Sequence, residues 1–597
     1  MIRALRVAVQ TLFDIPMWLI GLFGAVYGLS GLSGFLLYNV YLLSQRMGQM
    51  EIAGAVQYGL FVLLACPLFF SRRPLSETLY RCGITRVLLI WLLGVPKDRF
   101  LRAKRSSWRG LPVVTVVLAL AAGIWSSQLS RFVVFQQISS AWYPLVVPLG
   151  LLLVTLIGMV ITVPETGVVL SCTCMAFLWT DTQWSLWLLL AVIAVTWIGY
   201  VVQLLQAHRT LRFDVLDHMV LLFGVVILFG GAVGYRAGGD SMQRAAVLFA
   251  LLSLYFPIVN LMVTRTHIKR CWVGVCITAC FVAISMSARY IQAEELRWLE
   301  LVWPRLGTVV ADGFANTVHW LADGDPEWQS MFLVLCMPLL CAFFFRCRRL
   351  LWRVVIGLLF SATVVLIVAS GSRGAFVATV ISLLLMCFMS HHRALAFGIL
   401  ALPVAGGVWL WSPLLPSAWR GIGRRLADWL SSWGGLYLDR YWDGIRQIIR
   451  THPAGIGLRD GAFEALYPFF ASSSDRPYSG SGSLYLDILI TLGIPGLLIF
   501  GMTIFFFVQK SVTTLSRSGG SLDRLLILGG LTGVIGVLLF GAARSMGDGI
   551  MVYVGFWMVV ALINAYGNVV ETETAALAAH CMRRGKGQGH DFVGRIG

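Results

Sequence analysis

Residues 352–370 read WRVVIGLLFSATVVLIVAS, an apolar stretch with a single charged residue, Arg353. A helix of about 20 such residues crosses the roughly 30 Å hydrocarbon core of a bilayer with its backbone hydrogen bonds satisfied internally. Similar runs recur along the chain, which has 597 residues, is 58% hydrophobic and contains only 12% charged residues. A water-soluble domain could not bury that much apolar surface, so the sequence predicts an all-α polytopic membrane protein.

The apolar runs predict about sixteen transmembrane helices by the rule of roughly 20 residues per span. The first run follows a charged start, yet it is too long for a cleaved signal peptide, and we expect it to be retained. The predicted spans lie near residues 17–43, 56–70, 111–128, 141–162, 166–180, 183–201, 217–236, 245–264, 272–289, 329–346, 352–370, 375–390, 394–411, 483–508, 524–543 and 549–566.

The chain carries 46 Lys and Arg against 28 Asp and Glu, a net charge of +18. In a soluble protein this excess would suggest nucleic-acid binding. Here the basic residues gather in short segments beside apolar runs, which is typical of cytoplasmic loops and predicts no nucleic-acid partner. With these segments inside, both termini are expected in the cytoplasm. The basic clusters are 72–73, 97–109, 265–270, 346–353 and 583–595.

Two segments predicted to lie outside are long. One, 290–329, is rich in acidic residues, and the other, 412–482, far exceeds the usual loop length. In the second segment tryptophans and arginines alternate with apolar positions, which is typical of interfacial helices at the level of the lipid headgroups. We therefore expect 412–482 to be a large functional loop.

The segment 412–482 contains eight arginines and no lysine. A site that grips a diphosphate prefers the planar guanidinium, which bonds two oxygens at once. The alternative is that these arginines bind anionic lipid headgroups nonspecifically or pair with carboxylates of the same loop. They are Arg420, Arg424, Arg425, Arg440, Arg446, Arg450, Arg459 and Arg476.

The sequence Gly371-Ser372-Arg373-Gly374 stands where one predicted span ends outside and the next begins. Ser372 can cap the new helix, and Arg373 then lies beside its N-terminal amides, so a cation and a helix dipole converge on one place. The pattern is that of an anion site. A snorkelling arginine that anchors a helix end is the competing interpretation.

A third motif joins residues 451–458, Thr-His-Pro-Ala-Gly-Ile-Gly-Leu, to residues 485–496, which follow the pattern Tyr-Leu-x-x-Leu-x-x-x-Gly-x-x-Gly. Together with the Ser-Arg-Gly at a helix start, these motifs resemble the O-antigen ligase and O-antigen polymerase family. The resemblance covers about residues 359–501. It implies a GT-C-like glycosyltransferase of many spans that acts on undecaprenyl-diphosphate glycans at the periplasmic face of a bacterial inner membrane, without a nucleotide sugar, a cofactor or a metal.

Within this resemblance, Arg373 matches the family arginine that opens a helix, and Arg440 matches the arginine before the His-Pro stretch. Many members, the ligases in particular, carry His-Asn just before the Tyr-Leu of the last motif. Gly482 and Ser483 stand in those places here. The absence of that histidine favours a polymerase over a ligase that transfers glycan to lipid A core.

The chemistry can also be argued from the residues. A diphosphate is a good leaving group, so the catalyst must neutralise its growing charge and hold an acceptor hydroxyl in line with the anomeric carbon. We expect Arg373 and Arg440 to meet the first need, supported by Arg446 or Arg450. A general base would meet the second; the candidates are Asp487, His452, Asp443 and Glu464.

Several of these residues also have purely structural explanations. Asp487 can be an acid favoured by a helix N-terminus, and His452 can belong to a turn before proline. Arg544 and Asp548 are further candidates for the site, but they are close enough in sequence to pair with each other.

The domain organisation and function follow as predictions. Residues 1–328 form an N-terminal transmembrane region of unassigned role, 329–570 form the ligase- or polymerase-like core with the periplasmic loop 412–482, and 571–597 form a basic cytoplasmic tail. The expected partners are a lipid-linked oligosaccharide donor, a glycan acceptor, membrane lipids and other polysaccharide-assembly proteins. A transporter of lipid-linked sugars and a non-catalytic scaffold remain alternatives, although no internal repeat typical of transporters is visible.

Overall fold

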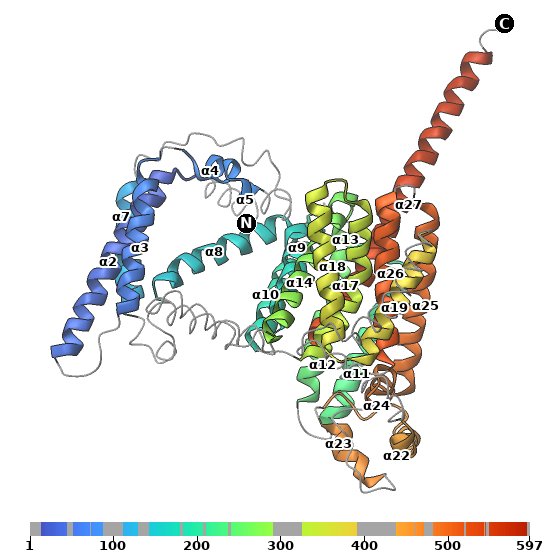
Figure 1. Ribbon diagram of the computed structural model, residues 1–597. Helices are drawn as coiled ribbons and strands as arrows, with labels where there is room; N and C mark the ends of the chain where they lie inside the picture. The colour runs from blue at the N-terminus through green and yellow to red at the C-terminus, as the bar shows by residue number, and fades with distance from the viewer. Residues whose placement is uncertain are drawn as a thin grey trace, which may run out of the picture. The chain divides into compact units, whose positions relative to one another are not determined.

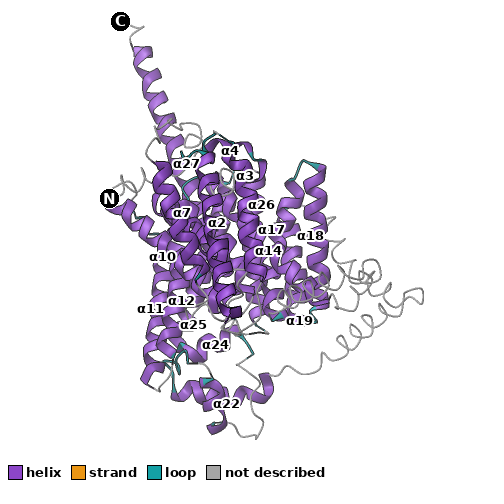
Figure 2. Cartoon of the chain, turned by 90° about the vertical axis from the view of Figure 1, so that its left-hand side faces the viewer, coloured by secondary structure: helices purple, strands orange, loops and turns teal. Residues whose placement is uncertain are grey.

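The computed structural model describes residues 14–44, 52–71, 73–86, 111–128, 143–179, 183–206, 211–236, 240–290, 325–390, 438–459, 461–470, 482–518, 521–542, 544 and 549–593. These residues form helices and no strand (Figures 1 and 2). Among them, eleven helices are long and apolar enough to cross a membrane, and four more apolar helices are shorter. Each of the fifteen overlaps a predicted span, while the sixteenth, 394–411, lies outside the described residues. The prediction of an all-α polytopic membrane protein is confirmed.

The chain divides into two compact units, one made of residues 1–167 with 198–202 and the other of residues 168–197 with 203–597. The predicted boundary at residue 328 concerned function rather than compactness, and it stays a prediction. In the first unit α2 packs against α3 and α7. Its helices are α2 (Met17–Ser44), α3 (Ile52–Phe69), α4 (Leu75–Arg81), α5 (Gly83–Arg86), α7 (Leu111–Ser127) and α8 (Tyr143–Thr162).

Small residues allow the close packing of this first unit. A Cβ on Gly28 of α2 would lie 2.7 Å from the side chain of Val62, and one on Gly123 of α7 would lie 2.6 Å from the carbonyl oxygen of Tyr27. Tyr58 and Ser126 share a buried hydrogen bond of 2.8 Å between their hydroxyls. Glycine-mediated approach and hydroxyl hydrogen bonds between helices are the usual means of helix association in lipid.

The second unit contains the remaining helices, and α17 and α27 form its core. Fourteen consecutive residues of α17, 329–342, are buried. The unit includes η5 (Met175–Trp179), α11 (Val215–Arg236), α12 (Ser241–Ser253), α13 (Tyr255–Leu261), α14 (Arg265–Tyr290), α17 (Pro326–Arg346), α18 (Leu350–Ala369), α19 (Arg373–Met389), α22 (Leu438–Thr451), α23 (Ala462–Leu466), η7 (Tyr467–Phe469), α24 (Leu484–Thr491), α25 (Gly493–Arg517), α26 (Ser521–Gly541) and α27 (Ile550–Val593). Helices α9 (Pro164–Cys174) and α10 (Gln183–Leu205) belong partly to each unit.

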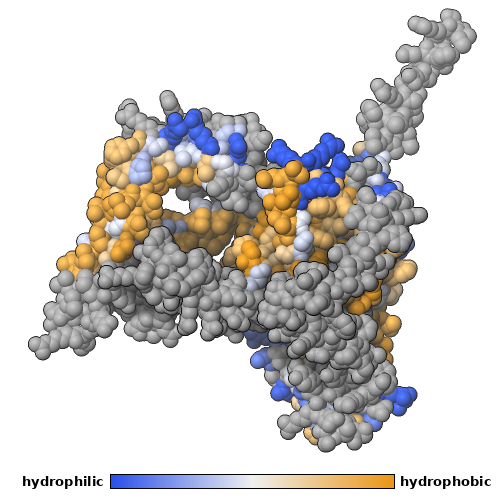
Figure 3. Space-filling model, in the orientation of Figure 1, coloured by the Kyte–Doolittle hydropathy of each residue, from blue (hydrophilic) through white to orange (hydrophobic). Residues whose placement is uncertain are grey.

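The second unit has two chemically different ends. Gln329 of α17 donates a 3.0 Å hydrogen bond to Ser285 of α14, so these helices are antiparallel and their basic ends, Arg346 and Arg265, lie together. We call this end the basic end, and Figure 3 shows hydrophilic residues gathered there. Helices α22 to α24 lie at the opposite end (Figure 1), which we call the loop end. The clusters 265–270 and 346–353 of the second unit therefore share one end.

Two predicted spans are each divided in the structure. The run 483–508 becomes the short α24 followed by α25, with the break at Gly493, which has a φ of +72°. The run 245–264 becomes α12 and α13, separated by Leu254. In the first case the break brings a short helix to the loop end, where it can contribute side chains to a site.

Candidate functional site

The His-Pro-x-Gly-x-Gly motif forms an extended clamp at the loop end. The amides of Ile456 and Gly457 donate to the carbonyl oxygens of Ile490 and Thr491 at the end of α24, at 2.8 and 3.0 Å, and Ile494 returns a 3.0 Å bond to Pro453. The amide of Leu458 donates to the Ser241 hydroxyl at the start of α12, at 3.1 Å. The motif therefore fixes three elements together and places the residues that follow it, beginning with Arg459, between them.

Glycine is required in this clamp because backbones touch. Gly455 and Gly457 have φ values of +89° and +90°. A Cβ on Gly457 would lie 2.4 Å from Cα of Gly234 in α11, and one on Gly493 would lie 2.4 Å from the carbonyl oxygen of Pro453. The positive φ and the lack of space both exclude a side chain.

Replacing Gly493 with alanine is expected to destabilise the protein by more than about 3 kcal/mol, since the side chain adds overpacking to backbone strain. Gly461→Ala is the matched control, because Gly461 also has a positive φ, +67°, but no atom lies within 4 Å of its Cβ position. Thermal unfolding in detergent measures both. Equal losses of stability would contradict the packing role of the clamp.

A cavity of about 360 Å³ opens beside this clamp. Four charged residues line it: Arg244 from α12, Arg459 from the clamp, Glu464 from α23 and Asp487 from α24. Its floor is aromatic and carries side chains of α11, α25 and α27, namely Phe223, Phe500, Tyr553, Phe556 and Trp557. An apolar cavity with a few convergent charged groups is the usual form of a small-molecule site.

Two of the predicted bases, Asp487 and Glu464, therefore lie in one cavity. Arg244 and Arg459 bring two cations to the same place. Such a set can bind an anionic group through the guanidinium groups and accept a proton from a hydroxyl through a carboxylate. It matches the two needs derived for a diphosphate leaving group.

The arginines predicted on α22 lie elsewhere. Ile445 and Ile448 are buried in a cluster with Phe463, Tyr467, Leu486 and Ile490. The same helix leaves Arg446 and Arg450 exposed, and neither lines the cavity. The apolar face of this part of α22 thus packs on protein, and the prediction of interfacial helices at headgroup level stays a prediction.

The other predicted residues of α22 and its end are placed less fully. Arg440 and Asp443 fall within α22, but their side chains lie outside the described part of the structure. His452 is exposed, with Nδ1 2.9 Å from the Thr451 hydroxyl and its ring edge-on to Phe470, and it does not line the cavity.

Arg373 begins α19, as predicted. Ser372 is the N-cap, and its hydroxyl accepts a hydrogen bond from the amide of Ala375 at 3.4 Å. Helix α18 begins just after Arg346 at the basic end and runs for 20 residues, so Arg373, which follows it, lies at the loop end. Arg373 is exposed at the loop end and is not among the residues that line the cavity.

Arg544 contacts residues other than its predicted partner. Its guanidinium lies 2.6 Å from Glu327 and 3.5 Å from Asp325, at the start of α17, and 5.4 Å from the Trp328 ring centroid. Its carbonyl oxygen accepts from the amide of Leu484, which anchors α24. Asp548 lies outside the described residues. The pairing of Arg544 with Asp548 therefore stays a prediction, and the contacts of Arg544 that the structure describes join it to the start of α17.

Sequence reasoning missed Arg244 and did not single out Arg459. Arg244 opens the predicted span 245–264 on the external side, where arginine runs against the positive-inside pattern, and this exception is the signal that could have identified it. In the described part of the chain, no group of three or more His, Cys, Asp or Glu is arranged to hold a metal ion.

Comparison with known proteins places part of this site in a family. A family model described as O-antigen ligase matches residues 355–501, about a quarter of the chain. No curated protein matches the chain significantly. The matched region includes the clamp, Arg459, Glu464 and Asp487, whereas Arg244 lies outside it. The chain therefore contains an O-antigen ligase family region at residues 355–501, which indicates ligase- or polymerase-type activity.

Proposed function

We propose that this protein is a polysaccharide polymerase for O-antigen, capsule or exopolysaccharide. It would transfer a glycan from undecaprenyl diphosphate to a lipid-linked acceptor at the periplasmic face of a bacterial inner membrane. The observation that carries the proposal is the cavity at the loop end, in which Arg244 and Arg459 accompany Asp487 and Glu464.

The orientation follows from charge. Basic loops are retained on the cytoplasmic side, so the basic end, with Arg265 and Arg346, faces the cytoplasm. The loop end and its cavity then face the periplasm, where the lipid-linked glycan is available. With both termini in the cytoplasm, the tail 571–597 lies on the side opposite the chemistry.

The reaction needs no metal or nucleotide sugar in this proposal. A hydroxyl of the acceptor sugar attacks the anomeric carbon of the donor, and the bond from that carbon to the diphosphate oxygen breaks. The guanidinium groups of Arg244 and Arg459 stabilise the negative charge that grows on the diphosphate. Asp487 accepts the hydroxyl proton, and Glu464 holds the acceptor in line. Arg373 and Arg440 remain proposed diphosphate ligands at the same face.

The two residues at the places of the family His-Asn pair, Gly482 and Ser483, support a polymerase over a ligase. Ser483 is buried, and its hydroxyl donates a 3.3 Å hydrogen bond to the carbonyl oxygen of Gly541. The preceding Gly482 has a φ of +72° and no side chain. This position therefore holds a structural turn and offers no imidazole to a lipid A core acceptor.

Single replacements of Arg373 and Arg440 with lysine test the assignment in cells. Lysine keeps the charge but loses the two-pronged hydrogen bond to a diphosphate. We expect long-chain polysaccharide to be lost while protein level and the delivery of single repeat units to the periplasm stay normal. The measurement is gel analysis of glycan length together with extraction of lipid-linked units.

Other outcomes identify the alternatives. Units that accumulate on the cytoplasmic side would support a transporter, and full-length chains that stay on their lipid carrier would support a ligase. Unchanged glycan length in both variants would remove Arg373 and Arg440 from the proposed site, and unchanged length in Arg244→Lys and Arg459→Lys as well would support a scaffold.

A further inference from the structure

The three helices that carry the aromatic floor of the cavity meet there. The ring centroid of Phe223 on α11 lies 5.6 Å from that of Phe500 on α25 and 5.5 Å from that of Trp557 on α27. All three residues line the cavity. The shape of the floor therefore depends on the separation of α11, α25 and α27.

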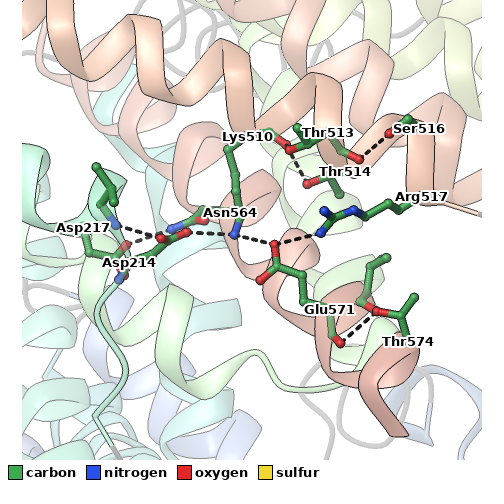
Figure 4. A network of polar contacts seen from close by, with 12 residues as sticks. Asp214, Asp217, Lys510, Thr513, Thr514, Ser516, Arg517, Asn564, Glu571 and Thr574 are labelled. Atoms are coloured by element: carbon green, nitrogen blue, oxygen red, sulfur yellow. Dashed lines mark hydrogen bonds and ion pairs between the residues drawn. The ribbon is translucent and has the colours of Figure 1, made fainter. Parts of the chain in front are cut away.

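The same three helices meet again nearer the basic end, around Lys510 of α25 (Figure 4). Its Nζ lies 2.8 Å from Oδ2 of Asp214, which directly precedes α11, and 2.9 Å from Oε1 of Glu571 on α27. The Lys510 side chain is only 14% exposed. Arg517 approaches the same Glu571 oxygen at 3.6 Å. One ammonium group thus bridges all three helices.

A buried polar cluster continues this bridge into the unit. Asp217 is 1% exposed. Its Oδ1 accepts hydrogen bonds from the Tyr255 hydroxyl at 2.7 Å and from Nδ2 of Asn564 at 2.8 Å, and its Oδ2 accepts one from the amide of Asp214. A buried carboxylate is costly unless it is hydrogen-bonded in this way. The cluster therefore holds α11, α13 and α27 in one arrangement.

The Asp214 carboxylate is held in its charged form. Partial burial on its own would raise its pKa, but the hydrogen bond from Lys510 and that from the amide of Val215 outweigh burial, so the pKa lies below the ordinary value. The ion pair to Lys510 is thus present at neutral pH.

The two meeting points lie a few helical turns apart. At 1.5 Å per residue, Lys510 lies about 15 Å from Phe500, Asp214 about 14 Å from Phe223 and Glu571 about 21 Å from Trp557. The buried cluster lies between them, with Asp217 about 9 Å from Phe223 and Asn564 about 10 Å from Trp557. Packed helices transmit a change in separation over such distances because protein interiors are close-packed.

We propose that Lys510 is a positioning residue for the cavity. By bridging Asp214 and Glu571 it fixes the separation of α11, α25 and α27, and so sets the shape of the aromatic floor that holds the donor. The labelling measurement below does not depend on the proposed function. Only the kinetic measurement assumes that the protein transfers glycan from a lipid-linked donor.

A second ion pair provides a matched control. Lys269 of α14 lies 2.9 Å from Asp523 of α26, also at the basic end. Neither α14 nor α26 lines the cavity. Lys269→Met and Lys510→Met therefore each remove a lysine from an ion pair. Lys510 itself joins three helices that form the floor, whereas Lys269 joins two that do not, and Asp523 keeps its ion pair with Arg265 in Lys269→Met.

The experiment measures the floor directly in the full-length protein. Ile227 of α11 lines the cavity, so the substitution Ile227→Cys places a thiol there. The thiol is labelled with a small maleimide. The extent of labelling is measured on the peptide that contains residue 227, so that the native cysteines do not interfere. We expect Lys510→Met to raise the labelling rate at this position about fivefold or more, by local opening, and Lys269→Met to leave it within about twofold. Lys510→Arg, which keeps the cation, should restore the original rate.

A catalytic readout separates positioning from general stability. We expect the apparent KM for the lipid-linked donor to rise about fivefold in Lys510→Met with kcat nearly unchanged, because the floor binds ground state and transition state alike. If Lys510→Met fails to reach the membrane, Asp214→Asn takes its place, because it removes the ion pair between Lys510 and Asp214. The same changes in labelling rate and apparent KM are then expected.

The proposal is overturned if the labelling rate is unchanged, or if it rises equally in Lys510→Met and Lys269→Met. If the rate rises only in Lys510→Met but the wild type transfers no glycan between lipid carriers, the positioning role stands and the proposed function fails.

Discussion

Arg459→Ala is expected to lower the turnover of lipid-linked donor by about 10²- to 10³-fold, the range seen when one preorganised donor to a developing anion is removed. Arg459 follows the glycine clamp directly and lines the cavity with Arg244. Its charge stabilises the departing diphosphate more than the intact donor, so kcat should fall more than KM rises. Steady-state kinetics with purified protein and lipid-linked repeat units measure both constants.

Arg524→Ala is the control for this prediction. Arg524 is an exposed arginine near the start of α26, at the basic end. Its replacement removes the same charge from the protein but should leave turnover unchanged. A similar loss in both variants would show that net charge, rather than contact with the diphosphate, controls the rate.

Asp487→Asn is expected to lower kcat by about 10²- to 10⁴-fold, the usual contribution of a general base. The amide keeps the shape of the side chain but cannot accept the hydroxyl proton. Donor binding should be nearly unaffected, so a pre-steady-state binding measurement should give a dissociation constant close to that of the wild type.

Two variants define the role of Asp487. Glu464→Gln should cost less, since Glu464 is proposed to orient the acceptor and not to take its proton. Asp240→Asn should be neutral, because Asp240 is exposed, precedes α12 at the same end and does not line the cavity. If Glu464→Gln proved the more damaging change, the roles of the two carboxylates would be reversed.

Much of the fold could be predicted because it depends on local patterns. Apolar length predicted the spans, and the residue type of Ser372 predicted the cap of α19. The helical spacing of Ile445 and Ile448 against Arg446 and Arg450 would also have predicted that these arginines point away from the packed face of α22. The exposure of these two arginines was therefore predictable from the sequence.

The rest depends on contacts between distant segments. The break at Gly493 exists because Pro453 packs against it, and no local rule separates such a glycine from the others in apolar runs. Proximity in sequence suggests Asp548 as a partner of Arg544, but it could not indicate the contacts with Asp325 and Glu327, which come from the start of another helix.

The site itself shows the same limit. Asp487 and Glu464 were identified by chemistry and by placement near the predicted membrane surface, and the structure brings them into one cavity. Arg244 joins them only because the clamp binds Ser241, one turn earlier on α12. The motif resemblance begins near residue 359, so it does not include Arg244.

The most direct test of the account is a cryo-electron microscopy structure of the full-length protein in lipid nanodiscs with undecaprenyl diphosphate, the proposed leaving group, at saturating concentration. The account predicts density for the diphosphate in the cavity, within about 3 Å of the guanidinium groups of Arg244 and Arg459. A diphosphate bound at the basic end near Arg265, with the cavity beside Asp487 free of lipid phosphate, would contradict it.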